Sequence, residues 1–177
     1  MRKLLIFWVL AVFANMTFAG GQNDEMTKEE RKKAEAEKEY QLTKQMLENK
    51  NFVLESDFLQ DRYGNRVFVN STINFVAVDS ATAVIQVGSN YRMGPNGVGG
   101  VTARGRISKW ELREDKKHNF TLSMNVMTAI GIYDLHFSIG PSGRSTARLT
   151  GLRAGNLTFE GYLVPVEESS VYEGRSI

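Results

Sequence analysis

The glycine-rich segment from Gly88 to Gly105, GSNYRMGPNGVGGVTARG, is the most unusual grouping of residues that could bind a ligand. A loop that cradles a phosphate needs glycine-rich turns leading into a helix N-terminus, with a lysine nearby. This segment has no lysine, and no helix pattern follows it, so we expect a loop between two strands. Over the mouth of a barrel, its polar side chains and those of the next strand would meet a ligand: Asn90, Tyr91, Arg92, Asn96, Arg104 and Trp110.

The two histidines do not form a pattern typical of a metal site or a catalytic site. A zinc site needs three or four ligands at close spacing, and the chain has no HxH or HExxH motif. His136 shares the polar side of an expected strand with Asp134, but no serine has the context of a nucleophile elbow. His118 follows a charged turn. We therefore predict no catalytic residue, no metal site and no cofactor.

Three aromatic residues in expected strands could line a pocket or pack in a core: Trp110, Tyr133 and Phe159. Strand aromatics more often form the core or cross-strand pairs. Two carboxylates can act together in acid–base chemistry only if they lie close in space, and the sequence alone does not show which carboxylates do. Glu160, inside the last expected strand, is the acid whose burial is most worth checking.

The turn Asp79-Ser80-Ala81 resembles the Asp-Ser/Thr-apolar O-glycosylation motif of Bacteroides-type bacteria. We expect it to lie in an exposed hairpin turn, where a sugar could be attached to Ser80. The motif is short enough to arise by chance, so the sequence leaves this modification open.

The N-terminus has the layout of a secretory signal peptide over residues 1–19. Met1-Arg2-Lys3 precedes ten apolar residues, and small residues predict cleavage after Ala19. The apolar run is shorter than the about 20 residues that span a bilayer. We expect an exported protein, periplasmic or secreted, with no stable membrane insertion after cleavage. The alternative is an N-terminal anchor that is never cleaved.

The cysteine content and the charge exclude further kinds of protein. The chain has no cysteine, so it forms no disulfide and carries no lipid on a cysteine. Arg2 and Lys3 account for the whole excess of basic residues, which leaves 20 basic and 20 acidic residues after the signal. A nucleic-acid partner would favour a surplus of Lys and Arg, so we expect none.

Residues 20–50 predict a polar linker and a charged helix. Thr27 and Glu30 fit a capping box at the helix start. We expect residues 36–48 to dock on the following domain and residues 24–35 to be solvated. The alternative is a coiled-coil or partner-binding arm. The short apolar stripe comprises Ala36, Tyr40, Leu42, Met46 and Leu47.

From Asn51 onward, apolar residues recur with a period of two, which predicts an antiparallel β-domain over residues 51–165. No crossover helix separates the strands, and the period leaves a barrel and a two-layer sandwich equally open. We expect a bulge near Gly105 and an extended tail over 166–177. The about eight expected strands span 52–59, 73–78, 82–87, 101–113, 119–128, 132–139, 146–150 and 156–165.

Several segments together resemble the exported Bacteroidetes family catalogued as domain of unknown function 4251 (DUF4251). The most distinctive are Gly94-Pro95-Asn96-Gly97-Val98-Gly99-Gly100 and the closing Gly161-Tyr162-Leu163-Val164-Pro165. The resemblance runs from about Met46 to Gly174. It implies a bacterial, exported protein, but it brings no activity and no site residue.

Three functions remain for an exported, neutral β-domain. Our first hypothesis is non-enzymatic binding of an unknown ligand or envelope protein. The second is a small hydrolase or isomerase with its site in the barrel mouth. The third is an interaction or inhibitor module that acts through the glycine-rich loop. The oligomeric state stays open.

Overall fold

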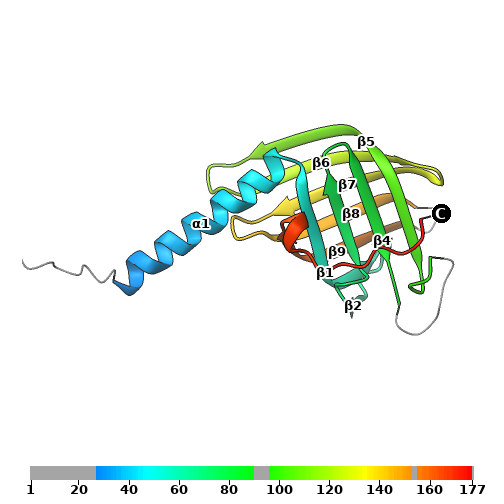
Figure 1. The fold of residues 1–177 in the computed structure, drawn as a ribbon, viewed down its shortest axis with the longest axis horizontal. Helices are drawn as coiled ribbons and strands as arrows, with labels where there is room; N and C mark the ends of the chain where they lie inside the picture. Colours follow the sequence, from blue (N-terminus) through cyan, green and yellow to red (C-terminus); the bar gives the residue numbers. More distant parts are fainter. Residues whose placement is uncertain (1–26, 90–95, 153–154, 177) are drawn as a thin grey trace, which may run out of the picture.

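The computed structural model describes residues 27–89, 96–152 and 155–176, and it shows a β-barrel preceded by one helix (Figure 1). The predicted signal peptide over residues 1–19, with its cleavage site after Ala19, lies outside the described residues. So do three candidate ligand-binding residues, Asn90, Tyr91 and Arg92.

The chain order is one helix, nine strands and a short 3-10 helix. The helix α1 spans Lys28–Glu48. The strands are β1 Asn51–Asp61, β2 Arg66–Phe68, β3 Phe75–Asp79, β4 Thr82–Val87, β5 Val101–Glu114, β6 Phe120–Thr128, β7 Gly131–Ile139, β8 Arg144–Leu152 and β9 Gly155–Val164, and η1 is Val166–Glu168.

Antiparallel pairing of the first and last long strands closes the sheet into a barrel. Strand β9 pairs with β1 from Val53↔Val164 to Asp61↔Leu157. The other edge of β1 is shared, because β3 pairs with its first half and β2 with Phe58–Gln60. Eight strands therefore form the closed wall, with β2 added beside β1. The fold is therefore a barrel and not a two-layer sandwich. The sequence pattern did not predict strand β2.

The barrel interior is filled by side chains that alternate inward along each strand. Phenylalanines from five strands are almost completely buried: Phe52, Phe75, Phe120, Phe137 and Phe159. All but Phe75 belong to the main core or pack within it, and Phe75 lies in a second, smaller cluster. A packed core over most of the barrel leaves space for a ligand only near its ends.

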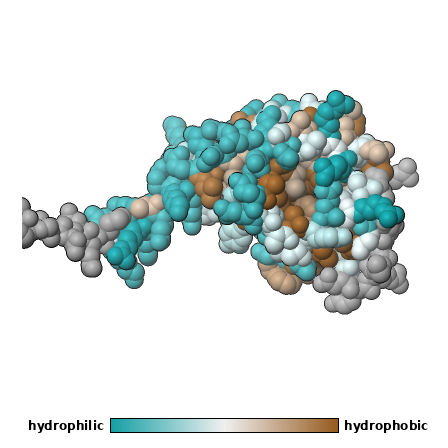
Figure 2. All heavy atoms as spheres, in the orientation of Figure 1, coloured by the Kyte–Doolittle hydropathy of each residue, from teal (hydrophilic) through white to brown (hydrophobic). Residues whose placement is uncertain are grey.

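Helix α1 begins with the predicted capping box and covers one end of the barrel with its last turns. The Thr27 hydroxyl accepts the Glu30 amide at 3.3 Å, and the Glu30 carboxylate accepts the Thr27 amide at 2.7 Å. Residues 27–35 are exposed, as expected, and Figure 2 shows hydrophilic side chains over the helix. Residues 36–39 were expected to dock but are exposed as well, so docking begins only at Tyr40. Across the described ranges, no helix is long and apolar enough to cross a bilayer.

The docked face of α1 differs from the expected stripe in three positions. Ala36 and Leu42 are exposed, whereas Tyr40, Thr43, Met46 and Leu47 are buried. Thr43 reaches the turn between β7 and β8, where a small hydroxyl fits close to glycine backbone. The stripe expected from apolar residues alone was therefore wrong for part of the face that docks on the barrel.

Strand β5 contains the expected bulge, but later than predicted. The register shifts between Ile107 and Lys109, and not at Gly105. The extra residue reverses the inward alternation, so Ile107 and Trp110 both pack against the main core. An unbroken period of two would place these two side chains on opposite faces.

Residues 169–176 run as an extended tail over the outside of the barrel. Val171 packs on a second, smaller apolar cluster formed by Val53, Phe75 and Val84. The Tyr172 amide donates to a backbone carbonyl of the turn before β3, at 2.8 Å. The tail thereby keeps water away from outward-facing apolar side chains of β1, β3 and β4.

Candidate functional site

A hollow lies at the barrel end opposite α1, and we call it the mouth pocket. It has a volume of about 330 Å³. It is formed where β4 and β8 end and where β5, β7 and β9 begin, together with the β6–β7 turn. Its described lining is Ile85, Val87, Gly100, Val101, Ala103, Ile130, Tyr133, Leu149 and Leu157.

Small residues at the start of β5 create this space. Gly100 lies so close to β4 that a Cβ atom added there would sit 2.0 Å from the Val87 carbonyl oxygen. Glycine is therefore required for the backbone approach. Ala103 lies opposite Ile85 in the β4–β5 pairing and leaves the wall thin. The pocket exists because this wall lacks the large side chains that fill the rest of the barrel.

The described candidate ligand-binding residues, Asn96, Arg104 and Trp110, are not brought together. Trp110 packs against the core beside Phe52, with a ring-centroid distance of 6.4 Å, and the Lys50 ammonium lies 5.1 Å from its ring. Arg104 is exposed on the outer face of β5 and pairs with Glu173 of the tail. Neither side chain lines the mouth pocket.

Asn96 is buried and takes part in a hydrogen-bond network in the part of the glycine-rich segment that leads into β5. Its Oδ1 accepts the amides of Val98 and Gly100, at 3.1 and 2.9 Å. Its Nδ2 donates to the Thr102 hydroxyl at 3.0 Å, and that hydroxyl donates to Gln86 at 2.8 Å. In this structure Asn96 holds the segment that leads into β5, and both of its polar atoms are bound by the protein.

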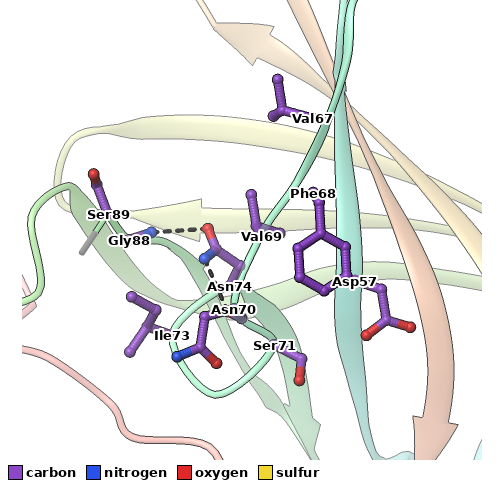
Figure 3. A pocket seen from close by; sticks show the side chains of 10 residues that line it. All are labelled: Asp57, Val67, Phe68, Val69, Asn70, Ser71, Ile73, Asn74, Gly88 and Ser89. Atoms are coloured by element: carbon purple, nitrogen blue, oxygen red, sulfur yellow. Dashed lines mark hydrogen bonds between the residues drawn. The ribbon is translucent and has the colours of Figure 1, made fainter. Parts of the chain in front are cut away.

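A second hollow, which we call the side pocket, opens beside β2 and has a volume of about 550 Å³ (Figure 3). Asp57 is the one charged residue of its described lining. Figure 3 shows the Asn74 side chain donating to the Asn70 carbonyl and accepting the Gly88 amide, both at 2.9 Å. These hydrogen bonds stabilise the turn before β3. With Asp57, two asparagines and two serines in its lining, the side pocket is more polar than the mouth pocket.

The titratable groups of the barrel meet mainly at the end covered by the helix. Glu114 accepts hydrogen bonds from Tyr40 at 2.7 Å and Lys44 at 3.1 Å, and it contacts His118 at 2.8 Å. These partners, His118 first, lower the pKa of Glu114 to about 2. The cluster joins α1 to the β5–β6 hairpin and has a structural role.

The remaining groups considered for chemistry are paired locally. His136 lies 3.0 Å from the Ser123 hydroxyl, and Asp134 accepts a hydrogen bond from Asn125. Glu160 is not buried deeply, and it pairs with Arg66 at 2.7 Å. Among the residues that the structure describes, no three or more histidine or carboxylate side chains are grouped as a metal site would require.

Ser80 lies where the sequence predicted, in an exposed two-residue turn between β3 and β4. Its φ is 53°, and its hydroxyl donates to Asp79 at 3.0 Å. An enzyme could reach this turn from solvent. Glycosylation of Ser80 stays a prediction.

Sequence reasoning identified one residue of the mouth pocket among its aromatic candidates, namely Tyr133. It missed the aliphatic lining, such as Ile85, Leu149 and Leu157. These residues have the same inward alternation as core residues, so their own pattern does not separate a pocket wall from a packed core. The separating signal is the small wall made by Gly100 and Ala103.

Comparison with known proteins identifies a family and a similar solved structure. The family model described as a domain of unknown function (DUF4251) matches residues 34–163. The crystal structure of a DUF4251 family protein from Bacteroides eggerthii is similar, with a TM-score of 0.66 and 29% sequence identity. The match covers 81% of this chain and 99% of that chain. The search of curated proteins gave no match.

Proposed function

Because this chain belongs to the DUF4251 family, a domain of unknown function, we propose a function from the barrel itself. The protein is an exported, non-enzymatic binding protein that takes a small apolar molecule into the mouth pocket. The observation that carries this proposal is the lining of that pocket. Its described residues are aliphatic except for Tyr133 and Gly100, and it opens at one end of an otherwise filled barrel.

The size and character of the mouth pocket support a small ligand. Ligand pockets have volumes of about 300–1,000 Å³ and mainly apolar walls. The mouth pocket, at about 330 Å³, lies at the lower end of this range. Apolar surface transferred out of water contributes roughly 25 cal/mol per Å², so burial of the ligand supplies most of the affinity.

The enzymatic alternative has less support. The described lining of the mouth pocket holds no carboxylate, imidazole or ammonium group. A hydrolase or isomerase at this place would need such groups for general acid–base catalysis. An interaction module acting through the glycine-rich loop also has less support, since Asn96 and Gly100 are bound within the protein.

Export is the part of the proposal that rests on the signal-like residues 1–19, and the lack of a cysteine-linked lipid rests on the absence of cysteine. A periplasmic or secreted protein that is free of a lipid anchor would meet its ligand in the envelope or outside the cell. Fractionation of the producing bacterium, followed by N-terminal sequencing, tests the location and the cleavage after Ala19 together.

The binding proposal is tested with N-phenyl-1-naphthylamine, a neutral apolar dye whose fluorescence rises when it leaves water. We expect saturable binding to the purified protein. Val101→Trp should abolish it, because Val101 is half-exposed at the rim and an indole ring there fills the pocket. Thr146→Trp is the matched control, since Thr146 is exposed on the outer face of β8. Equal dye binding by both variants would overturn the proposal.

A further inference from the structure

Tyr133 is the single side chain of the described mouth-pocket lining that carries a polar atom. It is only 8% exposed. Its hydroxyl makes no hydrogen bond with the described chain, yet it is not among the side-chain oxygens sealed from solvent. The hydroxyl is therefore open to solvent, belongs to a residue that lines the apolar pocket, and has no partner in the described chain.

The contrast with Tyr40 shows that this arrangement is specific to the pocket. Tyr40 is also 8% exposed, and its hydroxyl donates to Glu114 at 2.7 Å. Buried tyrosine hydroxyls usually have a hydrogen-bond partner, because an unpaired polar group in apolar surroundings costs free energy. The chain provides that partner for Tyr40 but not for Tyr133.

The backbone beside Tyr133 leaves the hydroxyl uncovered. Gly131, at the start of β7, has no side chain, and a Cβ atom built there would lie 3.9 Å from the hydroxyl oxygen. The described lining also contains no cation that could pair with a carboxylate. The described side chains of the site thus offer one neutral hydrogen-bonding group within an apolar hollow.

We propose that the ligand is a compact apolar molecule with one neutral hydrogen-bonding oxygen, an alcohol, phenol or carbonyl, which pairs with the Tyr133 hydroxyl. This inference rests on the proposed function, since it assigns the ligand class of the same pocket. An anionic oxygen is disfavoured, because burying a charge without a counter-ion is costly. Tyr133 acts here as the specificity-determining residue.

Three probes of nearly equal size test the inference by displacement of N-phenyl-1-naphthylamine: 2-naphthol, 2-methylnaphthalene and 2-naphthoate. We expect 2-naphthol to bind about three- to tenfold more tightly than 2-methylnaphthalene, as for one additional hydrogen bond. We expect 2-naphthoate, ionised at neutral pH, to bind most weakly. In Tyr133→Phe, 2-naphthol should fall to the affinity of 2-methylnaphthalene, which should itself be unchanged.

Tyr162→Phe is the matched control, because Tyr162 is exposed on the outer face of β9. This substitution should leave the affinities for all three probes unchanged. Tyr133→Phe should also keep the melting temperature of the parent protein, since its hydroxyl bonds to no described group. A clear loss of melting temperature would mean a structural role and would overturn the inference. Equal binding of 2-naphthol and 2-methylnaphthalene by the parent would overturn it as well, while leaving the proposed function intact. If the dye and all three probes fail to bind, the proposed function itself fails.

Discussion

The Oε1 atom of Gln86 accepts a hydrogen bond from the backbone amide of Gly174, at 2.8 Å, and so joins strand β4 to the C-terminal tail. The same oxygen accepts the Thr102 hydroxyl at 2.8 Å. The Nε2 atom donates to the carbonyls of Ile73 and Tyr172, at 3.1 and 2.8 Å. One fully buried amide therefore satisfies four groups from the tail, β5 and the turn before β3.

Replacing this amide with an apolar side chain should destabilise the protein and loosen its tail. Gln86→Leu leaves two donors and two acceptors without their partner, and each buried unpaired group costs about 1–3 kcal/mol. We expect the free energy of unfolding in urea to fall by at least about 1–3 kcal/mol. Limited proteolysis should also cut residues 169–176 faster.

The control is Gln41→Leu on the exposed face of α1, where the side chain bonds only Glu37. It should change stability by less than about 0.5 kcal/mol. Similar unfolding curves for Gln86→Leu and Gln41→Leu would contradict a central role for Gln86.

Acid should weaken the attachment of α1 through Glu114. The folded-state pKa of Glu114 is lowered from 4.5 to about 2, mainly by His118 and then by Tyr40 and Lys44. A lowered folded-state pKa means that the stabilisation is complete above the unfolded value and is lost as the pH falls from about 4.5 towards 2. The melting temperature of Glu114→Gln should lie below that of the parent at pH 6, and the two should converge near pH 2.

Glu111→Gln provides the comparison, because Glu111 is an exposed carboxylate on the same strand that pairs only with Lys109, at 3.2 Å. Its melting curves should follow those of the parent over the whole pH range. If Glu114→Gln also followed the parent throughout, the cluster would not attach the helix.

Two buried serines should respond differently to removal of the hydroxyl. Ser56 is completely buried and its Oγ has no partner, whereas the Ser145 Oγ donates to the Gly143 carbonyl at 2.9 Å. Ser56→Ala should be neutral or stabilising, and Ser145→Ala should cost about 0.5–1.5 kcal/mol. Urea unfolding of both variants measures the difference, and an equal loss in both would contradict the assignment of an unpaired hydroxyl at Ser56.

Docking of α1 should depend on Leu47 and not on Leu42. Leu47 is completely buried against the barrel, so Leu47→Ala should lower the free energy of unfolding by about 2–5 kcal/mol. Leu42 is exposed, and Leu42→Ala should change it by less than about 0.5 kcal/mol. Chemical denaturation with helix and barrel signals recorded separately shows whether α1 is released first. Comparable losses from both substitutions would mean that the helix docks by a different face.

Local patterns predicted the elements of this fold well. The capping box at Thr27 placed the helix start, and each of the eight expected strands overlaps an observed strand. These features depend on neighbouring residues, whose periodicity is visible in the chain. Strand β2 was missed because its three residues are all exposed and carry no buried alternation.

Long-range features were beyond the sequence pattern. Closure of the barrel rests on pairs such as Leu54↔Leu163, and a period of two is the same in a barrel and a sandwich. The bulge before Lys109 changes which face Trp110 occupies, although the chain shows no glycine at that point. The mouth pocket was only partly foreseen, because Leu149 and Leu157 have the pattern of ordinary core residues.

Because β1 pairs with β9, the barrel closes only after the last strand has been synthesised, and the chain is open to misfolding until then. Until β9 has been made, β1 and β8 each present an unpaired edge, and until the tail follows, Val53, Phe75 and Val84 face water. Open edges readily pair with another chain. Two chains that meet while these edges are open can exchange their β9 strands once synthesis ends, so the expected misfolded product is a strand-swapped dimer.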